Sequence, residues 1–469
     1  MHLWLEWFRC VALLRPACAR HSTFLWMCLA LCGLSVRSDL AGVTSFVRAL
    51  WLTPDSYRRL LHLFHTPALD LPKLTSIWIR MVSTLVRPLT LDGRVVFIAD
   101  GLKVPKEGRK MPAVKKLHQS SVDNNKPTFI FGHSFQAVAL LARGRQGRPF
   151  AVPLASRIHE GLVFSNRHRR TLLDKLVALF LEIVKLNGTR ALLIADAYYA
   201  SRKVMQPLLV ERHHLISRGR INITAWHPAP RPKRRRRGRP KVYGTKVRLR
   251  DLFGDKQRFV SALSPVYGEQ RVKIAYRCVD LLWRPIGRHV RFVLTIHPRR
   301  GRLILMCTDI TIDPLKVIEF YGYRFKIESG FKQALHTLGG YAYHFWMMDM
   351  KPIPLRRSGD QYLHMQSEEY RRHVRRKVDA YHRYVQLGCI AQGLQQHLAA
   401  NFRTNVWHHF RSWMRTMKPA LPPSEAVVAQ SLRASLPEFL AAATEDHELR
   451  EFILERLDPE RCPAMQLAG

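Results

Sequence analysis

Two acidic residues each follow a run of apolar residues of the kind that forms a buried strand. Asp100 ends Val-Val-Phe-Ile-Ala-Asp, and Asp196 ends Leu-Leu-Ile-Ala-Asp. An unpaired carboxylate is costly to bury, so an acid at the end of a buried strand is normally hydrogen-bonded, ion-paired or bound to a metal ion. For either aspartate alone, capping a loop or pairing with an arginine explains the position equally well.

A third acid, Glu328, follows later in the segment Phe320–Lys332. If this segment is one helix, four polar residues share a stripe at positions i, i+3, i+7 and i+11: Tyr321, Arg324, Glu328 and Lys332. A polar stripe on an otherwise apolar helix indicates a polar partner. The alternative is a solvated face with an Arg324–Glu328 pair, which on a surface helix would stabilise by only about 0.3–0.5 kcal/mol.

A short basic segment, Arg231–Lys241, contains eight cations in eleven residues. Its centre, Arg237-Gly238-Arg239-Pro240, resembles an AT-hook, whose extended Arg-Gly-Arg core lies in the narrow minor groove of A·T-rich DNA. The alternative is a solvated basic loop that touches phosphates without sequence preference. Both interpretations predict contact with DNA through Arg237 and Arg239.

The composition excludes a disordered chain and indicates a polyanionic partner. Of 469 residues, 47% are hydrophobic and 10% aromatic, which is enough for a sizeable core. The net charge of +41 exceeds what solubility requires, and nucleic acid is the leading candidate partner. The eight cysteines show no CxxC pair and no zinc-ligand spacing, which fits a reducing compartment.

The first part of the chain, to about Leu91, has apolar residues at helical spacing. Its most apolar stretch, Ser22–Val36, is about 15 residues long and short of a bilayer span, so we expect a buried helix rather than a membrane segment or signal peptide. Two short helices, 40–50 and 54–64, could form a helix-turn-helix that reads a DNA end. Plain helical packing is the alternative.

The middle of the chain predicts a mixed-sheet α/β core with an insertion. The expected order is three strands (95–100, 128–141, 150–158), a helix (171–186) and a buried central strand (191–196). A basic β-rich insertion follows from about 202 to 302, with strands at 216–226, 272–283 and 290–297. The core then resumes with a strand at 303–307 and a helix that starts at Asp313-Pro314. Beyond Gly340 the pattern is mostly helical.

These motifs together resemble a known family. A strand ending in Ala-Asp-Gly, a second ending in Ala-Asp, a β-rich insertion, and then Tyr321-x2-Arg324-x3-Glu328 after a Thr-Asp-x4-Pro turn resemble the DDE-type transposases of bacterial insertion sequences. Within them the likeness is to the cut-and-paste group with a Tyr-Arg-Glu-Lys signature, over about 94–340. The family's lysine lies seven residues after the glutamate, where this chain has Leu335. Lys332, one turn earlier, is the candidate replacement.

The resemblance implies a ribonuclease H-like fold and a role for each motif residue. Asp100, Asp196 and Glu328 would be the catalytic residues and the ligands of two Mg²⁺ ions, or Mn²⁺ in their place, and Mg²⁺ does prefer oxygen ligands of this kind. Tyr321, Arg324 and Lys332 would bind DNA. In this group the ends are released through a hairpin with a flipped base, for which Trp283 or Trp226 is the candidate stacking partner. Either tryptophan is also a candidate core residue.

The implied organisation and partners follow from the same resemblance. We expect a helical DNA-binding domain (1–91), a catalytic core (92–201 and 302–345), the basic insertion (202–301) and a C-terminal helical region (346–469). The partners would be double-stranded DNA, as terminal inverted repeats and target, and a second copy of the chain on paired ends, with no membrane, in the bacterial cytoplasm at the nucleoid. Two alternatives remain: a nuclease of the same fold without strand transfer, and a non-catalytic DNA-binding protein derived from a transposase.

Overall fold

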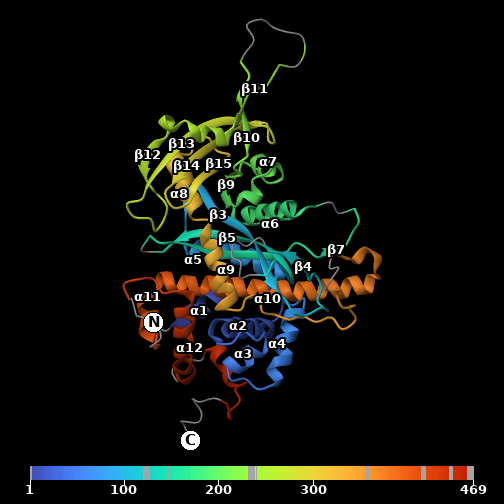
Figure 1. Ribbon diagram of the computed structural model, residues 1–469. Helices are drawn as coiled ribbons and strands as arrows, with labels where there is room; N and C mark the ends of the chain where they lie inside the picture. Colours follow the sequence, from blue (N-terminus) through green and yellow to red (C-terminus); the bar gives the residue numbers. More distant parts are fainter. Residues whose placement is uncertain are drawn as a thin grey trace. The chain divides into compact units, whose positions relative to one another are not determined.

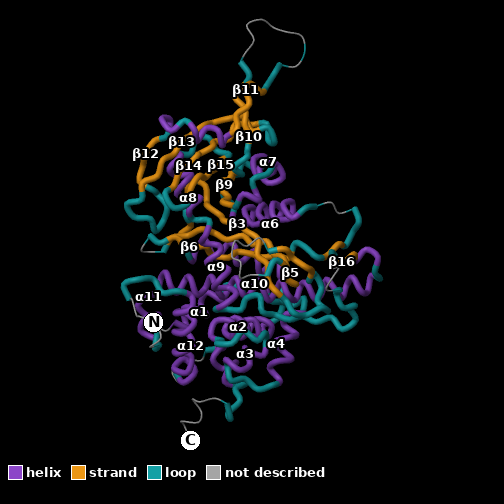
Figure 2. Tube along the Cα trace, in the orientation of Figure 1, coloured by secondary structure: helices purple, strands orange, loops and turns teal. Residues whose placement is uncertain are grey.

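The computed structural model describes residues 3–119, 127–144, 147–167, 170–230, 238, 240–354, 359–412, 419–442 and 447–461. The chain divides into two compact units, each built from separate stretches of sequence. Unit 1 comprises Met1–Pro88, Gly101–Arg169 and Glu328–Gly469, and unit 2 comprises Leu89–Asp100 and Arg170–Ile327. Each unit is described by itself below. Figure 1 shows the elements in sequence colours, and Figure 2 separates helices from strands.

Unit 2 is built on a large mixed sheet. Its strand order is β3 (Arg94–Pro105), β8 (Ala191–Ala195), β9 (His214–Gly219), β15 (Gly301–Cys307), β14 (Arg288–His297), β13 (Lys273–Trp283), β10 (Thr224–Pro228) and β11 (Tyr243–Arg248). β2 (Thr90–Leu91) pairs with β3, and β12 (Val260–Leu263) pairs with β13. The β3–β8 and β8–β9 pairs are parallel, whereas the sheet continues antiparallel from β15 onward. The protein is therefore a mixed α/β protein with a large mixed sheet and flanking helices.

Three helices of unit 2 are α6 (Leu172–Asn187), α7 (Arg202–Val210) and α8 (Pro314–Gly322). α6 begins where the sequence predicts, because the backbone N–H and hydroxyl of Thr171 both donate to Asp174 at 2.7 Å. It ends at Gly188, whose φ of +73° is the left-handed conformation that glycine adopts without strain. Phe180 of α6 packs edge-on against Phe97 of β3, which fixes the helix on the sheet.

The single strand expected at 216–226 is two strands. β9 ends at Gly219 and β10 begins at Thr224, and the turn between them is closed by the Ile223 N–H, which donates to the Arg220 carbonyl at 3.0 Å. Ile221 in this turn is 54% exposed. Its apolar side chain made the turn resemble a continuation of a buried strand in the sequence. β9, which the sequence assigned to the insertion, pairs in parallel with β8 and antiparallel with β15.

Unit 1 contains most of the helices. They are α1 (Leu3–Ala12), α2 (His21–Val36), α3 (Thr44–Ala49), α4 (Asp55–His65), α5 (Leu71–Leu85), α10 (Glu368–Asn401), α11 (Arg403–His409), α12 (Glu425–Ala441) and α13 (Glu448–Leu454). Its strands are β1 (Arg87–Pro88), β4 (Lys115–His118), β5 (Phe129–Arg143), β6 (Pro149–Ile158), β7 (Leu162–Val163) and β16 (Gln361–Tyr362). α10, the long orange helix of Figure 1, packs against β6 and against α2, α4 and α5.

The N-terminal helices agree with the sequence expectation. α2 is buried along most of its length, and its residues Met27–Cys32 are all fully buried. No helix in the described part of the chain has both the length and the apolar composition that a bilayer span requires. α3 and α4 coincide with the two short helices expected, and their role as a DNA-reading pair stays a prediction. The seven cysteines in the described ranges are all free thiols.

The chain beyond Gly340 is mostly helical, as expected, but residues 341–354 and 359–367 are not. These residues form loops, β16 and one 3₁₀ turn, and the next α-helix begins at Glu368. Two backbone N–H groups of the segment bond to a distant loop. Met347 N–H donates to the Lys110 carbonyl at 3.0 Å, and Ile353 N–H donates to the Arg109 carbonyl at 2.9 Å. Pro352 and Pro354 also oppose a helix here.

α10 packs closely on the rest of unit 1 at Gly393. A Cβ at this position would lie 2.3 Å from Trp78, a buried side chain whose indole N–H donates to the Pro153 carbonyl at 2.9 Å. We expect Gly393→Ala to lower the free energy of unfolding by about 1–3 kcal/mol, because the indole cannot move without losing its hydrogen bond. Urea denaturation measures the change. Gly359→Ala, where a Cβ meets nothing within 4 Å, is the control and should change stability little.

Candidate active site

The structure brings Asp100 and Asp196 together at one edge of the parallel part of the unit 2 sheet. β3 and β8 pair residue by residue from Val95↔Ala191 to Ala99↔Ala195, and each aspartate is the next residue. The sequence predicts Asp100 at the end of its strand. This prediction is wrong, because β3 continues past Asp100 to Pro105. Asp100 does lie where the pairing with β8 stops. Its side chain is 20% exposed, so it remains accessible.

The backbone around Asp196 is held firmly. All five residues of β8 are buried, as in a strand covered on both faces. The Ser217 hydroxyl of β9 donates to the Asp196 carbonyl at 2.9 Å, and the chain then turns away through the buried Tyr199. These contacts fix the direction in which the Asp196 side chain leaves the sheet.

Tyr321 and Arg324 each contact one of the two aspartates. The Tyr321 hydroxyl donates to Asp196 Oδ1 at 3.3 Å, and Arg324 Nη1 donates to Asp100 Oδ2 at 3.3 Å. Burial, followed by the negative charge of Asp196, raises the pKa of Tyr321, so its phenol stays protonated and acts as a donor. Both contacts, at 3.3 Å, are longer than the 2.7–2.9 Å typical of charge-assisted hydrogen bonds.

The single helix expected through Tyr321, Arg324 and Glu328 is two helices. α8 ends at Gly322, and α9 (Phe325–His336) begins after a turn at Tyr323 and Arg324. Arg324 N–H donates to the Tyr321 carbonyl at 3.0 Å, which is an i→i−3 bond. Residues three apart eclipse each other in such a tightened turn, so Tyr321 and Arg324 still face the same side. Sequence periodicity does not distinguish this break from a continuous helix.

Glu328 and Lys332 lie on α9, and both are exposed. This helix passes from unit 2 into unit 1 between Ile327 and Glu328. The structure therefore describes these two residues within unit 1, whereas the two aspartates belong to unit 2. Their membership of the site stays a prediction.

A cavity of about 470 Å³ opens beside Asp196 within unit 2. Its lining includes Asp196, Tyr321, Arg324, Arg218, Arg300 and Thr295. Arg300 pairs with Glu269 at 2.8 Å, whereas Arg218 is exposed and has no ion pair among the described residues. The buried Thr295 hydroxyl has no hydrogen-bond partner in the described part of the chain. The cavity thus places the Arg218 cation and an unused hydroxyl beside Asp196, and no sequence motif pointed to Arg218 or Thr295.

The sequence predicts four further DNA contacts, of which the structure describes two, Trp226 and Trp283. Arg237 and Arg239 lie outside the described residues. Trp283 is 6% exposed and belongs to the core, so it is not an open stacking surface. Trp226 is partly buried against Tyr243, at 5.9 Å between ring centroids, with the Arg284 guanidinium 5.8 Å from its ring.

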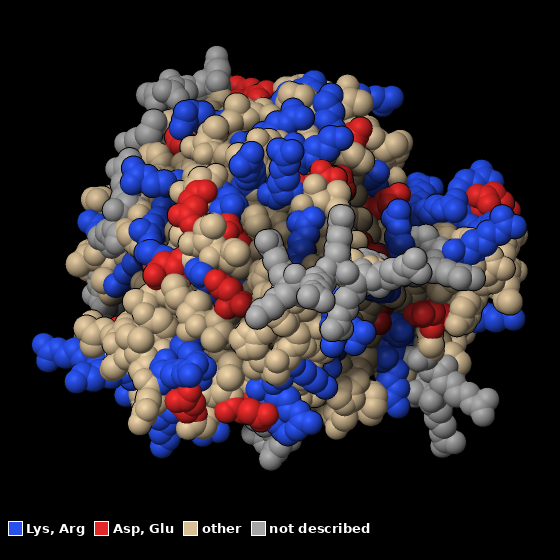
Figure 3. Space-filling model, turned by 90° about the horizontal axis from the view of Figure 1, so that it is seen from above, with Lys and Arg blue, Asp and Glu red and all other residues tan. Residues whose placement is uncertain are grey.

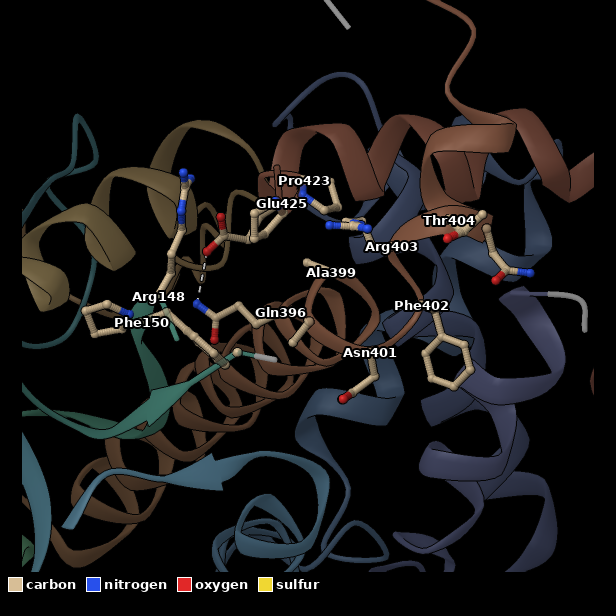
Figure 4. A pocket seen from close by; sticks show the side chains of 15 residues that line it. Arg148, Phe150, Gln396, Ala399, Asn401, Phe402, Arg403, Thr404, Pro423 and Glu425 are labelled. Carbon is tan, nitrogen blue, oxygen red and sulfur yellow. Dashed lines mark hydrogen bonds between the residues drawn. The ribbon is translucent and has the colours of Figure 1, made fainter. Parts of the chain in front are cut away.

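A different cavity, of about 350 Å³, lies in unit 1 near the C-terminal end of α10 (Figure 4). Gln396 Nε2 donates to Glu425 Oε1 at 2.9 Å there, and Arg148 and Arg403 flank this pair. None of the predicted catalytic residues lines it. It is therefore separate from the candidate site.

The donor chemistry of Asp100 and Asp196 fits a hard divalent cation. A carboxylate has two oxygens and about four lone-pair directions, so a contact with Arg324 or Tyr321 leaves capacity for a metal ion.

Among the described residues, one cluster of three ligand-type side chains, Glu6, Cys10 and His397, is buried in unit 1. Arg9 donates to both Glu6 oxygens at 2.8 Å and His397 Nε2 lies 3.0 Å from Glu6 Oε1, so this cluster is a satisfied ion-paired group of the core.

Comparison with known proteins identifies the family. The sequence model of the DDE superfamily endonucleases matches residues 17–274, which is more than half of the chain. The chain therefore belongs to the DDE superfamily endonucleases, as a transposase-like nuclease. The match includes Asp100 and Asp196 and ends before Tyr321. No curated protein sequence matches the chain. DDE superfamily nucleases typically use divalent metal ions, and the family implies a DNA substrate.

The two aspartates can be tested as metal ligands without DNA. We expect Asp100→Asn and Asp196→Asn each to weaken binding of Mn²⁺ to the free protein by about tenfold or more, because loss of even an outer-shell partner costs about 10–100-fold. Electron paramagnetic resonance of Mn²⁺ measures the free ion. Asp280→Asn, which removes an acid paired with Arg291 at 2.7 Å, is the control and should bind Mn²⁺ as the unaltered protein does. Unchanged binding in both site variants would exclude the aspartates as ligands.

Proposed function

We propose that the chain is a cut-and-paste transposase of a bacterial insertion sequence, of the group with a Tyr-Arg-Glu-Lys signature. It binds the ends of the element and catalyses strand cleavage and strand transfer. The observation that carries this proposal is the adjacency of Asp100 and Asp196, with Arg324 and Tyr321 in contact with them. The parallel strands β3, β8 and β9 beside antiparallel β15 support a ribonuclease H-like core.

Asp100, Asp196 and Glu328 would hold two Mg²⁺ ions, or Mn²⁺ in their place. Bound divalent ions activate an attacking water or 3′-hydroxyl and stabilise the leaving oxygen of an in-line displacement. The protein's part is to fix the ligand directions, which β3 and β8 do for the two aspartates. Glu328 would supply the third carboxylate from α9.

Arg324, Tyr321 and Lys332 would act on the DNA. A guanidinium binds phosphate bidentately, and a phenol donates to phosphate, so Arg324 and Tyr321 can exchange a carboxylate for a DNA strand. Both side chains lie at the aspartates, with contacts of 3.3 Å each, which supports such an exchange. Arg218, at the cavity beside Asp196, is a further cation within the same unit. Lys332 would take the place of the signature lysine.

The other parts of the chain would supply DNA binding and pairing of the ends. The helices of 1–91 and the basic insertion (202–301) with Arg237 and Arg239 would bind terminal inverted repeats and target DNA, around the catalytic core of 92–201 and 302–345. The C-terminal region (346–469) would join two copies into a dimer, in the bacterial cytoplasm at the nucleoid. The net charge of +41 supports a DNA partner, and Lys and Arg side chains are spread over the face in Figure 3.

The catalytic assignment is tested by three substitutions. We expect Asp100→Asn, Asp196→Asn and Glu328→Gln each to lower Mg²⁺-dependent cleavage of end-containing DNA by at least about 10²-fold, because each removes a metal ligand worth several kcal/mol in the transition state. DNA binding, measured by gel shift, should be retained. Cleavage within tenfold of the unaltered protein in any variant contradicts that residue's role. Cleavage without any strand transfer by the unaltered protein would identify a nuclease instead.

Arg324 separates DNA positioning from metal binding. We expect Arg324→Ala to keep Mn²⁺ binding and to slow release of the DNA end by on the order of 10²-fold, because in-line attack depends on near-attack geometry. Singly nicked DNA should accumulate on a denaturing gel if the ends pass through a hairpin. Lys332→Ala should give the same build-up if this lysine replaces the one missing at Leu335. Lys316→Ala, which changes an exposed cation on α8, is the control and should not lead to accumulation of nicked DNA. If Arg324→Ala lost both metal binding and nicking, the proposed division between DNA positioning by Arg324 and metal binding by the carboxylates would be contradicted.

A further inference from the structure

A second surface of unit 1 combines uncompensated positive charge with an exposed aromatic ring. A groove of about 750 Å³ is lined by side chains of α4 and α10 and by two loops, around Lys110 and around Trp346. Its cations are Lys110, Arg376 and Lys377, accompanied by three histidines, and Asp349 is the one acid among its described lining residues. None of the residues assigned above to catalysis lines this groove.

Trp346 is held as an open platform at this groove. Its side chain is 55% exposed, and no other described tryptophan is as exposed. A Cβ on Gly108 would lie 2.9 Å from the indole, so the ring rests against the backbone there. The neighbouring residues are fixed as well, because Met347 N–H donates to the Lys110 carbonyl at 3.0 Å and Lys110 Nζ donates to the Met348 carbonyl at 3.1 Å. An exposed ring in a fixed position loses little freedom when a ligand stacks on it.

The positive charges of the groove lack anionic partners. Arg376 and Lys377 form no ion pair with any described residue. Burial, and then the charge of Arg376, lowers the pKa of Lys377. Burial also lowers the pKa of His65, with Lys377 and Arg376 adding to the effect, and His65 Nε2 is buried without a described hydrogen-bond partner. A bound anion would relieve this repulsion.

We propose that this groove binds single-stranded DNA, with phosphates on Lys110, Arg376 and Lys377 and a base stacked on Trp346. The inference rests on the proposed function, in which DNA is the substrate. Cations beside an exposed aromatic face are the arrangement that binds single strands. Bases inside a duplex are already stacked and leave no face for Trp346, so the ring favours an unpaired strand over a duplex.

The aromatic contact is tested by anisotropy of a labelled single-stranded DNA of about 15 nucleotides, in a chelator so that no cleavage occurs. We expect Trp346→Ala to weaken binding by about 5- to 150-fold, the effect of losing one stacked base. Trp346→Phe should restore most of the affinity. Binding of a duplex of the same sequence should change by less than about twofold. Tyr362→Ala removes a ring that is 56% exposed elsewhere in unit 1, and it should have no effect.

The phosphate contacts are tested by salt dependence. For Arg376→Ala and Lys377→Ala we expect the slope of log affinity against log salt to fall by roughly 0.7 for each lost contact with a single strand. The control is Arg375→Ala, next in sequence. Its guanidinium lies 4.9 Å from the Phe164 ring and 3.3 Å from Glu368, so it is already engaged outside the groove. An equal change of slope in Arg375→Ala would contradict a specific contact.

Three outcomes would overturn the proposal. They are unchanged single-strand binding by Trp346→Ala, an equal loss for single strand and duplex, and tighter, Trp346-dependent binding of an RNA of the same sequence. The assay requires neither metal nor cleavage, so it is independent of the catalytic residues. If the unaltered protein cleaves no DNA but shows Trp346-dependent binding, the transposase proposal fails and the groove assignment stands.

Discussion

The parallel pairing of β3 with β8 is the constraint on which the candidate site depends. Five consecutive residue pairs, Val95↔Ala191 to Ala99↔Ala195, place Asp100 and Asp196 at neighbouring positions. Two carboxylates this close repel each other unless positive charge accompanies them. In the structure Arg324 supplies positive charge to Asp100, and the neutral Tyr321 hydroxyl donates a hydrogen bond to Asp196, at 3.3 Å each. During the proposed reaction, divalent ions would supply this positive charge. The same edge of the sheet therefore suits the protein both with and without bound metal ions.

The rest of unit 2 serves to keep this edge in register. α8 packs against β8, β9 and β15. Tyr321 of α8 therefore contacts Asp196 from a helix that is fixed on the same strands. At the other end of these strands Arg94 Nη2 pairs with the buried Asp309 at 2.7 Å, which ties the start of β3 to the residues after β15. Breaking such a pair on one side leaves an uncompensated buried charge, so it resists sliding of the strands.

The excess of basic residues has more than one physical use. Part of it stabilises the interior of unit 1. Arg37 is 2% exposed and donates to the Leu338 and Gly42 carbonyls, and Arg383 donates to the Leu69 and Phe64 carbonyls. Other cations, such as Arg376 and Lys377, are left without anionic partners in the described chain. A net charge of +41 is therefore not a measure of DNA contact, because only the tertiary structure shows which cations remain available.

The sequence by itself determined the features that depend on near neighbours. Apolar runs before Asp100 and Asp196, the Thr171 and Asp313 helix starts, and the buried helix at α2 follow from local pattern and capping. The tertiary structure decided what distant residues do together. It placed β9 beside β8, kept 341–354 out of a helix, and brought Arg324 to Asp100 and Met347 to Lys110. Each of these depends on a partner far away in the chain, and sequence periodicity records only whether a residue is buried, not what buries it.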